Sequence, residues 1–195
     1  MKNLYLFSIH FLILLFIPAK RTFAQNVLIT YYSESGHTSI LAKSVAEGAQ
    51  EIAGAEVRLL TIEKTSTDDL LWADAIILGS PVHSANIAAP VQEFIRSWPF
   101  EGQVLKDKIG AVFVTGGGIS AGEELAQMNL IHSMLVFNMI IVGGPSWDQP
   151  FGASAITGEG SFVSESEEAE IDTIFLIKGH ALGKRIAELA SRFEH

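Results

Sequence analysis

The sequence predicts an α/β domain of three layers, in which helices cover both faces of a parallel β-sheet. Five short apolar runs alternate with five amphipathic segments from Asn26 onward. The runs are apolar at consecutive positions, which is typical of strands that are buried on both faces. Repeated strand–helix alternation favours a doubly wound sheet with right-handed crossovers.

The first half of the domain contains three of the apolar runs. Asn26–Tyr32 is the first strand, and the helix at His37–Ala53 follows it with apolar residues along one face and a glycine after its end. Glu56–Ile62 is the second strand. A short helix at Thr67–Trp72 begins with a Ser-Thr-Asp-Asp cap. Ala75–Gly79 is entirely apolar and predicts a buried third strand.

The second half continues the alternation. The helix expected at Ile87–Trp98 has a proline in its first turn, where proline is tolerated. Ile109–Thr115 is the fourth strand, Gly122–Phe137 the fourth helix and Met139–Gly143 the fifth strand. The remaining expected elements are an irregular stretch at Gly144–Glu165, of a length that is usually functional or disordered, and a final helix at Ser166–Phe193, capped by Ser164–Glu167.

The first 24 residues have the pattern of a secretory signal peptide, or of an uncleaved N-terminal anchor. Lys2 precedes an apolar run at Leu4–Ala19, and small residues surround a cleavage site after Ala24. The run is shorter than the roughly 20 residues that a membrane-spanning helix needs. We therefore expect an exported, periplasmic or extracellular domain at residues 25–195, with membrane contact only through an uncleaved N-terminus. Without a signal the protein would be cytoplasmic.

The composition excludes several classes of function. The formal net charge is -9, and no basic stripe is present to meet the phosphates of a nucleic acid. The chain has no cysteine, which excludes disulfides, thiolate catalysis and cysteine-ligated metals. No histidine pair has metal-ligand spacing with a carboxylate partner, so we expect no metal site.

The turn after the first strand has the composition of a phosphate-binding site. Residues 33–38 have the sequence SESGHT and open the first helix. Hydroxyl groups and unpaired backbone N–H groups meet there at the positive end of a helix dipole. The turn has no lysine and only one glycine, which excludes a P-loop and a dinucleotide fingerprint. It suits a monophosphate such as that of flavin mononucleotide (FMN). An ordinary capped strand-to-helix turn is the alternative.

Two further loops should lie at the same edge, because ligands of parallel sheets bind beyond the carboxyl ends of the strands. The second loop is Ser80–Ile87, in which Pro81 and Asn86 are expected to fix the chain and to supply an amide side chain. The third loop, Thr115–Gly122, has three consecutive glycines that let the backbone approach a planar ring. Together the three loops predict a flavin site, whereas the glycine run alone is also explained as a flexible turn before a helix.

Five segments of the chain resemble those of a known family. They are Tyr31–Thr38, Ala46–Ala49, Ala73–Pro81, Asn86–Ile87 and Phe151–Gly158. They are similar to the flavodoxin superfamily, and within it to the tryptophan-repressor-binding-protein-like NAD(P)H:quinone oxidoreductases and the NADPH-dependent FMN reductases. The likeness spans most of the chain from Asn26 to His195. It implies a flavodoxin-like fold with a five-stranded parallel sheet in the order 2-1-3-4-5.

The resemblance also implies a cofactor and its ligands. FMN would be held without a covalent bond, its phosphate by Ser33, Ser35, Gly36, His37 and Thr38. The ring would be held by Pro81, Val82, His83, Asn86, Thr115, Gly116, Gly117 and Gly118. NAD(P)H would reduce the flavin, and a quinone-like small molecule would then take the electrons, so that no catalytic side chain is required. The family resemblance also implies a homodimer or a tetramer.

The chain departs from the family pattern at a few positions. Ile62–Leu70 is short where longer members carry an insertion, and Phe137-Asn138 stands where they have a histidine pair. Trp98 or Phe100 is expected to supply an aromatic ring over the substrate. Trp147 is expected either to stack on flavin or substrate or to pack in the core or an interface.

Two other functions are alternatives to the oxidoreductase hypothesis. One is a flavodoxin-like one-electron carrier without a nicotinamide site, which the acidic charge favours because carriers steer toward basic partners. The other is a binding domain that has lost its flavin.

Overall fold

The computed structural model describes residues 25–163 and 169–193. The expected signal peptide at residues 1–24 and the expected helix cap at Ser164–Glu167 lie outside the described residues. Within the described ranges, no helix is both long and apolar enough to cross a membrane.

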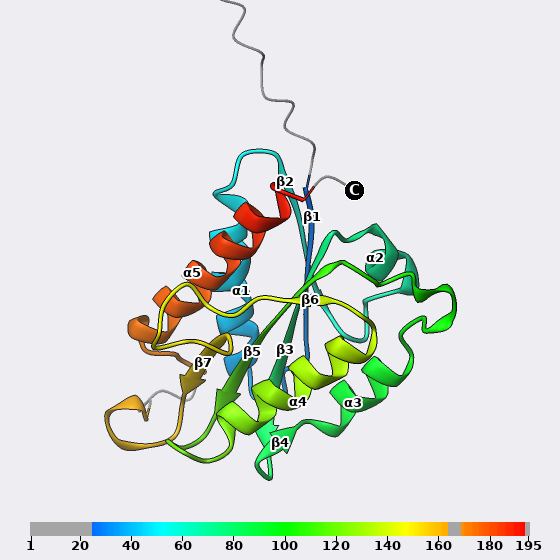
Figure 1. The fold of residues 1–195 in the computed structure, drawn as a ribbon. Coiled ribbons are helices and arrows are strands. Elements are labelled where there is room, and N and C mark those ends of the chain that lie inside the picture. Colours follow the sequence, from blue (N-terminus) through cyan, green and yellow to red (C-terminus); the bar gives the residue numbers. More distant parts are fainter. Residues whose placement is uncertain (1–24, 164–168, 194–195) are drawn as a thin grey trace, which may run out of the picture.

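A twisted parallel sheet forms the centre of the domain, and its order confirms the expected arrangement of strands (Figure 1). From one edge inward the strands are β2 (Ala55–Thr61), β1 (Gln25–Tyr31), β3 (Ala75–His83) and β5 (Ile109–Gly116). All neighbours in this series are parallel, as the crossover helices require.

The fifth strand position is divided between two short strands, a feature that the sequence analysis did not predict. β6 (Ile140–Ile141) pairs with the start of β5, and β7 (Ala153–Ile156) pairs with its end at Phe113–Gly116. The chain leaves the sheet after β6 and returns at β7. Part of the stretch expected to be irregular is therefore an edge strand, and it brings the residues after Ile156 to the carboxyl end of β5.

Helices cover both faces of the sheet, as expected for a doubly wound domain (Figure 1). One face is covered by α1 (His37–Gln50) and α5 (Thr173–Ala190). The other face is covered by α2 (Thr67–Trp72), α3 (Ala89–Arg96) and α4 (Glu123–Val136). Two short 3-10 helices, Glu101–Gln103 and Gly160–Phe162, lie in connecting segments.

Alternation along each strand explains why the runs are apolar at consecutive positions. Val27 and Ile29 are fully buried against α1 and α5, whereas Leu28 between them is fully buried in the core on the opposite face. Neighbouring residues of a strand point to opposite faces of the sheet. A strand covered on both faces therefore needs an apolar residue at every position.

The ends of the helices follow local signals, with one correction. The predicted cap of α2 is confirmed, because Ser66 and Asp69 form a reciprocal capping box. The final helix begins at Thr173 and not at Ser166. Asp172 is its N-cap and accepts a hydrogen bond from the backbone N–H of Ile174 at 2.9 Å. The aspartate side chain sets this start because it satisfies an otherwise unpaired amide of the first turn.

Candidate functional site

The three loops singled out in the sequence meet at the carboxyl end of the sheet. Thr38 and Thr115 join the first loop to the third through a hydrogen bond of 2.8 Å between their hydroxyl oxygens. His83 joins the second loop to the first, since its Nε2 lies 3.2 Å from the Oε2 of Glu34. Residues that are 77 positions apart in the sequence are thus in direct contact, as the predicted site requires.

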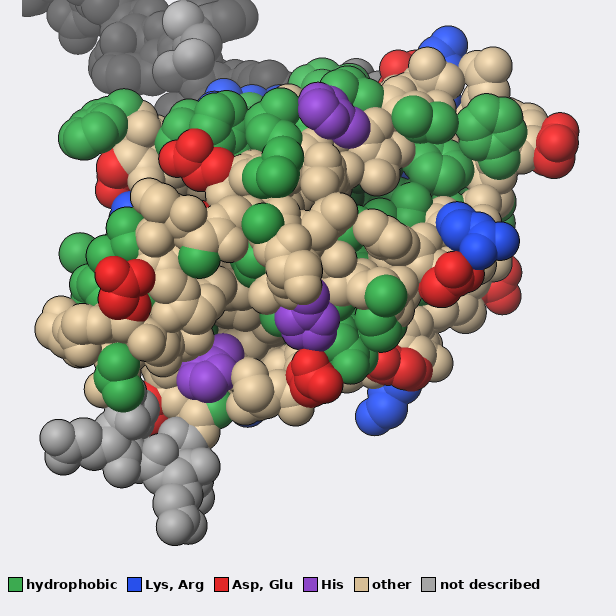
Figure 2. Space-filling view, turned by 90° about the horizontal axis from the view of Figure 1, so that it is seen from below, with side chains coloured by type: hydrophobic (Ala, Val, Ile, Leu, Met, Phe, Trp, Pro, Cys, Tyr) green, Lys and Arg blue, Asp and Glu red, His purple; other side chains and the backbone are tan. Residues whose placement is uncertain are grey.

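Figure 2 looks directly at this edge of the molecule. Most of the surface there is backbone and uncharged polar side chain, with histidines among them, and lysine and arginine side chains are few and lie toward the margin. An anion at this edge would have to be held by hydrogen-bond donors and a helix dipole, without a dominant cationic side chain.

The first loop leaves backbone amides without a side-chain cap. Gly36 is the N-cap residue of α1, has φ of 93°, and has no side chain to cap the helix. Ser33 Oγ accepts the backbone N–H of Ser39 at 3.2 Å, which satisfies one amide of the first turn. The arrangement differs from an ordinary capped turn, in which the N-cap side chain would occupy the space in front of the helix.

The side chains of the first loop differ in their availability. Ser35 is exposed, and its Oγ lies 2.9 Å from Nδ1 of His37. Thr38 is only 2% exposed, and its hydroxyl is engaged with Thr115. The structure therefore gives the Thr38 hydroxyl a part in joining two loops, while its expected contact with a phosphate stays a prediction.

The second loop is a β-hairpin, a feature that the sequence analysis did not predict. β3 continues through Pro81 to His83, and β4 (Asn86–Ile87) returns antiparallel to it. Ser84 and Ala85 form the tip, with φ of 51° and 59°, the left-handed values that a tight two-residue turn needs. Pro81 is tolerated because β1 stops pairing with β3 at Gly79.

Asn86 fixes the second loop, as predicted, through contacts that turn its side chain toward α4. Its Oδ1 accepts hydrogen bonds from the backbone N–H of Ile87 at 2.7 Å and from Nδ2 of Asn129 at 2.8 Å. Ser80 Oγ, which is fully buried, accepts the backbone N–H of Ala88 at 3.0 Å. The hairpin is therefore held at its base. The contact of Asn86 with a flavin ring stays a prediction.

The third loop is packed on one side and open on the other. A Cβ atom on Gly116 would lie 3.6 Å from a methyl group of Val82, so this glycine faces the second loop. A Cβ atom on Gly117 would meet nothing within 4 Å. A Cβ atom on Gly118 would lie 2.9 Å from Oε2 of Glu159. The glycine run thus exposes backbone at its middle, which is what a planar ligand needs.

Four residues of the site were missed by the sequence analysis. They are Glu34, Glu123, Thr157 and Glu159. Glu123 opens α4, where an acidic residue is favourable for the helix dipole alone and so gives no signal of a site. Thr157 and Glu159 fell in the stretch expected to be irregular. The run of small and apolar residues at Ala153–Ile156, between a glycine and a threonine, is the signal that would have predicted β7 and so placed the two residues that follow it.

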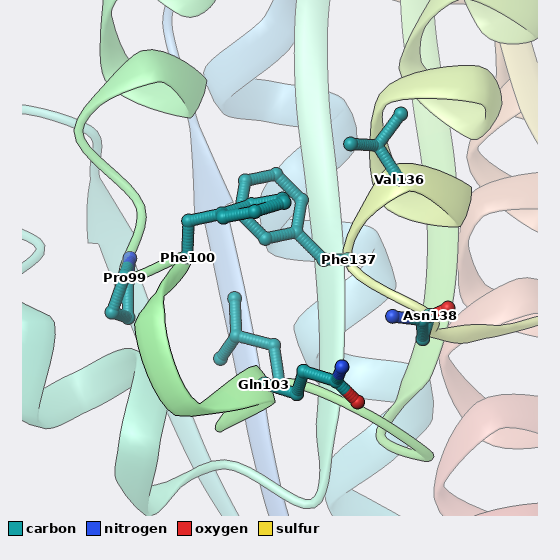
Figure 3. A pocket seen from close by; sticks show the side chains of 7 residues that line it. Pro99, Phe100, Gln103, Val136, Phe137 and Asn138 are labelled. Carbon is teal, nitrogen blue, oxygen red and sulfur yellow. The ribbon is translucent and has the colours of Figure 1, made fainter.

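Two aromatic residues expected over the substrate lie elsewhere in this chain. Trp98 and Phe100 follow α3, and both pack on Phe137 with ring centroids 5.3 Å and 5.9 Å apart. Figure 3 shows Phe100 and Phe137 beside one another in a small pocket between the ends of α3 and α4. Because both helices run antiparallel to the strands, this pocket lies at the amino end of the sheet, away from the three loops. The expectation that Trp98 or Phe100 of the same chain covers the substrate site is therefore wrong.

Trp147 and His180 lie in separate surroundings. Trp147 is 90% exposed, so its side chain does not pack in the core of this chain. His180 lies on α5, where its Nε2 is 3.1 Å from a carboxylate oxygen of Glu51. Among residues 25–163 and 169–193, no group of three or more histidine and acidic side chains is arranged to hold a metal ion.

Comparisons with known proteins identify relatives of the chain. A family model described as NADPH-dependent FMN reductase matches residues 27–152. An NAD(P)H dehydrogenase (quinone) from Geotalea uraniireducens is 30% identical over an alignment of 208 residues. The alignment includes 86% of this chain and 98% of the relative. A flavodoxin from Aquifex aeolicus is 29% identical over 180 residues, covering 86% of this chain and 88% of the relative.

A solved structure supports the fold independently. The crystal structure of the flavodoxin, WrbA-like protein from Agrobacterium tumefaciens matches with a TM-score of 0.65 and 21% sequence identity. The match covers 87% of this chain and 99% of that one. At this identity the likeness shows a shared fold and nothing finer.

Proposed function

The chain belongs to the NADPH-dependent FMN reductase family, and on that premise we propose that it uses FMN to carry electrons from NAD(P)H to a quinone-like acceptor. The observation that carries the proposal is the meeting of three loops at the carboxyl end of the sheet, joined by the 2.8 Å hydrogen bond between Thr38 and Thr115. Parallel sheets bind nucleotide cofactors at this edge.

The residues present fit FMN in two respects. The amino end of α1, where Gly36 has a left-handed conformation and no side chain, presents backbone N–H groups that suit a phosphate. The open side of Gly117 leaves room for a ring beside the backbone. In this proposal Ser33, Ser35 and the amides of the first turn hold the phosphate. The hairpin at Pro81–His83 and the third loop enclose the ring.

FMN, when bound, supplies the redox chemistry, and the protein binds and orients it. The first loop holds the anionic end of the cofactor at the amino end of α1. The hairpin and the third loop, which are linked to the first loop by His83 and Thr115, keep the two walls of the ring site at a fixed separation. Neither role needs a side chain that gains or loses a proton.

The proposal is tested with the protein purified from its native compartment. We expect a yellow protein with a flavin absorbance spectrum, and NADPH oxidation that requires benzoquinone. A colourless protein that takes up no FMN on titration would contradict the cofactor assignment and favour a binding domain without flavin.

A one-electron carrier is the second candidate function. It is supported by the similarity to the Aquifex aeolicus flavodoxin and by the net charge of -9, which favours association with basic protein partners. The same steady-state assay separates the two functions, because a carrier without a nicotinamide site shows negligible turnover of NADPH with benzoquinone while still binding FMN.

We also propose that residues 1–24 direct export of the protein. The proposal rests on the apolar N-terminal run and on the small residues before Gln25. Mass spectrometry of the protein from its native host tests it. A mature chain that begins at Gln25 is expected, and a full-length chain in the cytoplasmic fraction would contradict it.

A further inference from the structure

We propose that Glu159 is a positioning residue of the cofactor site, which fixes the third loop for the flavin ring and makes the bound flavin harder to reduce. The proposal rests on the proposed FMN function and extends it to a residue outside the three loops. Glu159 follows β7, and it reaches the site only because the divided edge strand returns the chain to the end of β5.

A hydrogen bond joins Glu159 to the third loop. Its Oε2 accepts the backbone N–H of Ile119 at 2.7 Å, across 40 residues of sequence. The same oxygen fills the space where a side chain on Gly118 would lie, at 2.9 Å from the Cβ position. Hydrogen bonds from an amide to a charged carboxylate are short and stronger than those between neutral groups. Glu159 thus determines how the chain turns immediately after the glycine run.

Glu123 holds the next two residues of the loop from the other side. Its two carboxylate oxygens accept the backbone N–H groups of Ser120 and Ala121 at 3.0 and 3.1 Å. Ser120 has φ of 58°, a left-handed value that costs free energy in any residue other than glycine. Three consecutive amides are therefore bound by two carboxylates, and Gly117 is the residue of the glycine run that remains open beside its Cβ position.

The end of β7 supports the glycine run from behind. The backbone N–H and the hydroxyl of Thr157 both donate to the carbonyl oxygen of Gly116, at 3.0 and 3.3 Å. A Cβ atom on Gly158 would lie 2.9 Å from the carbonyl oxygen of Gly117. The segment Thr157–Glu159 therefore packs closely on the loop, and the space beside the Cβ position of Gly117 is open. This is the geometry of a wall for a planar ring.

The charge of Glu159 carries the second half of the proposal. Among the ion pairs formed by the described residues, none includes Glu159 or Glu123, so their charges are met there by backbone amides alone. Reduction adds negative charge to a flavin. The Glu159 carboxylate, held against the third loop, would oppose that change through its negative charge, and the opposition would be stronger where the cofactor shields it from water. Glu159 should therefore lower the reduction potential of bound FMN.

The test compares three variants of the full chain. Glu159→Gln keeps an acceptor oxygen and removes the charge, and Glu159→Ala removes both. Glu101→Gln is the matched control, because it makes the same change in net charge in the 3-10 helix Glu101–Gln103, next to the aromatic pocket at the amino end of the sheet. Three quantities are measured: the amide exchange rate of Ile119 in protein freed of cofactor, the Kd for FMN, and the midpoint potential of bound FMN.

Glu159→Ala should speed exchange at Ile119 and raise the Kd for FMN about tenfold, as expected for the loss of one charge-assisted hydrogen bond. Glu159→Gln should change the Kd less and shift the potential to a more positive value. The control should match the parent protein. Unchanged FMN affinity in Glu159→Ala, or a potential shift in Glu159→Gln no larger than in the control, would overturn the proposal.

The result is distinguishable from a failure of the proposed function. If the parent chain binds no FMN, the proposed function fails and the positioning role toward the ring fails with it. The exchange rate of Ile119 in the cofactor-free protein still reports whether Glu159 fixes the loop. If the parent binds FMN and the Glu159 variants behave like the control, the proposed function stands and this inference alone is wrong.

Discussion

At the scale of single residues, the candidate site depends on small groups and on backbone. Gly36 gives the first loop its left-handed turn, and Gly117 leaves an open space beside the third loop. The hydroxyls of Thr38 and Thr115 are both buried and satisfy one another, at 2% and 4% exposure. These residues shape the site without adding charge to it, which suits a cofactor whose phosphate is bound mainly by amides.

The first prediction concerns charge in the first loop. Ser35→Glu places a carboxylate beside the proposed phosphate site, and two like charges a few ångströms apart repel by about 1 kcal/mol or more even near the surface. We expect the Kd for FMN to rise at least about fivefold. Fluorescence titration measures it, with Ser97→Glu, an exposed serine after α3, as the control. Equal affinity in both variants would show that the phosphate lies elsewhere.

A second prediction uses the open space beside Gly117. Its φ does not lie in the left-handed region, and a Cβ atom there meets no protein atom within 4 Å. Gly117→Val should therefore fold with nearly unchanged stability and yet lose flavin, because the valine occupies the place of the ring. Flavin content and urea denaturation measure the two effects. A variant that retains one FMN per chain would place the ring away from this loop.

At the scale of elements, glycines set the distance between α1 and α5. A Cβ atom on Gly183 would lie 1.8 Å from the carbonyl oxygen of Val45, and one on Gly48 would lie 1.9 Å from that of His180. The two helices therefore approach backbone to backbone. This contact fixes the carboxyl half of α1 against α5.

The third prediction follows from this close approach. Gly183→Ala should destabilise the domain by about 1–3 kcal/mol, as overpacking does in a rigid core, because the obstructing atom is backbone. Gly179→Ala is the matched control in the same helix: its Cβ atom would meet the end of the Leu41 side chain at 2.7 Å, which can move aside. Urea denaturation compares them. Equal losses of stability in the two variants would contradict this explanation.

At the scale of the whole molecule, the layered architecture places the site at one end and most of the stabilising core away from it. Two separate apolar cores lie on the two faces of the sheet, and the strands contribute alternate residues to each. The loops at the carboxyl end are held mainly by hydrogen bonds between polar groups. Cofactor binding should thus stabilise the folded domain as a whole through mass action, without rearranging its core.

The fourth prediction tests this stabilisation. At a free FMN concentration of 100 times Kd, unfolding should require about 2.7 kcal/mol more than in the cofactor-free protein. Riboflavin at the same concentration should stabilise much less, because it has the ring and lacks the phosphate that α1 is proposed to bind. Thermal unfolding measures both. Equal stabilisation by the two ligands would show that the phosphate contributes nothing to binding.

The sequence contained the strands, the helices on both faces and the three loops, because each is a local pattern. The order of the strands was implied only by the resemblance to a known family. An apolar residue at every strand position predicts burial on both faces, as Val27–Ile29 confirm. The cap at Ser66 predicts the start of α2. Parallel strands with short crossovers leave one edge at which loops after neighbouring strands meet.

Folding in three dimensions was needed for the features that depend on distant partners. The hairpin of β3 and β4 depends on left-handed conformations of Ser84 and Ala85 at its tip. Neither residue is a glycine, so the sequence gives no signal of this turn. The return of β7 to β5, and with it the contact of Glu159 with Ile119, depends on pairing between segments 40 residues apart. A hydrogen bond between two distant residues produces no periodic pattern in the sequence. Either residue could occur in many other surroundings, and only the folded sheet brings the two together.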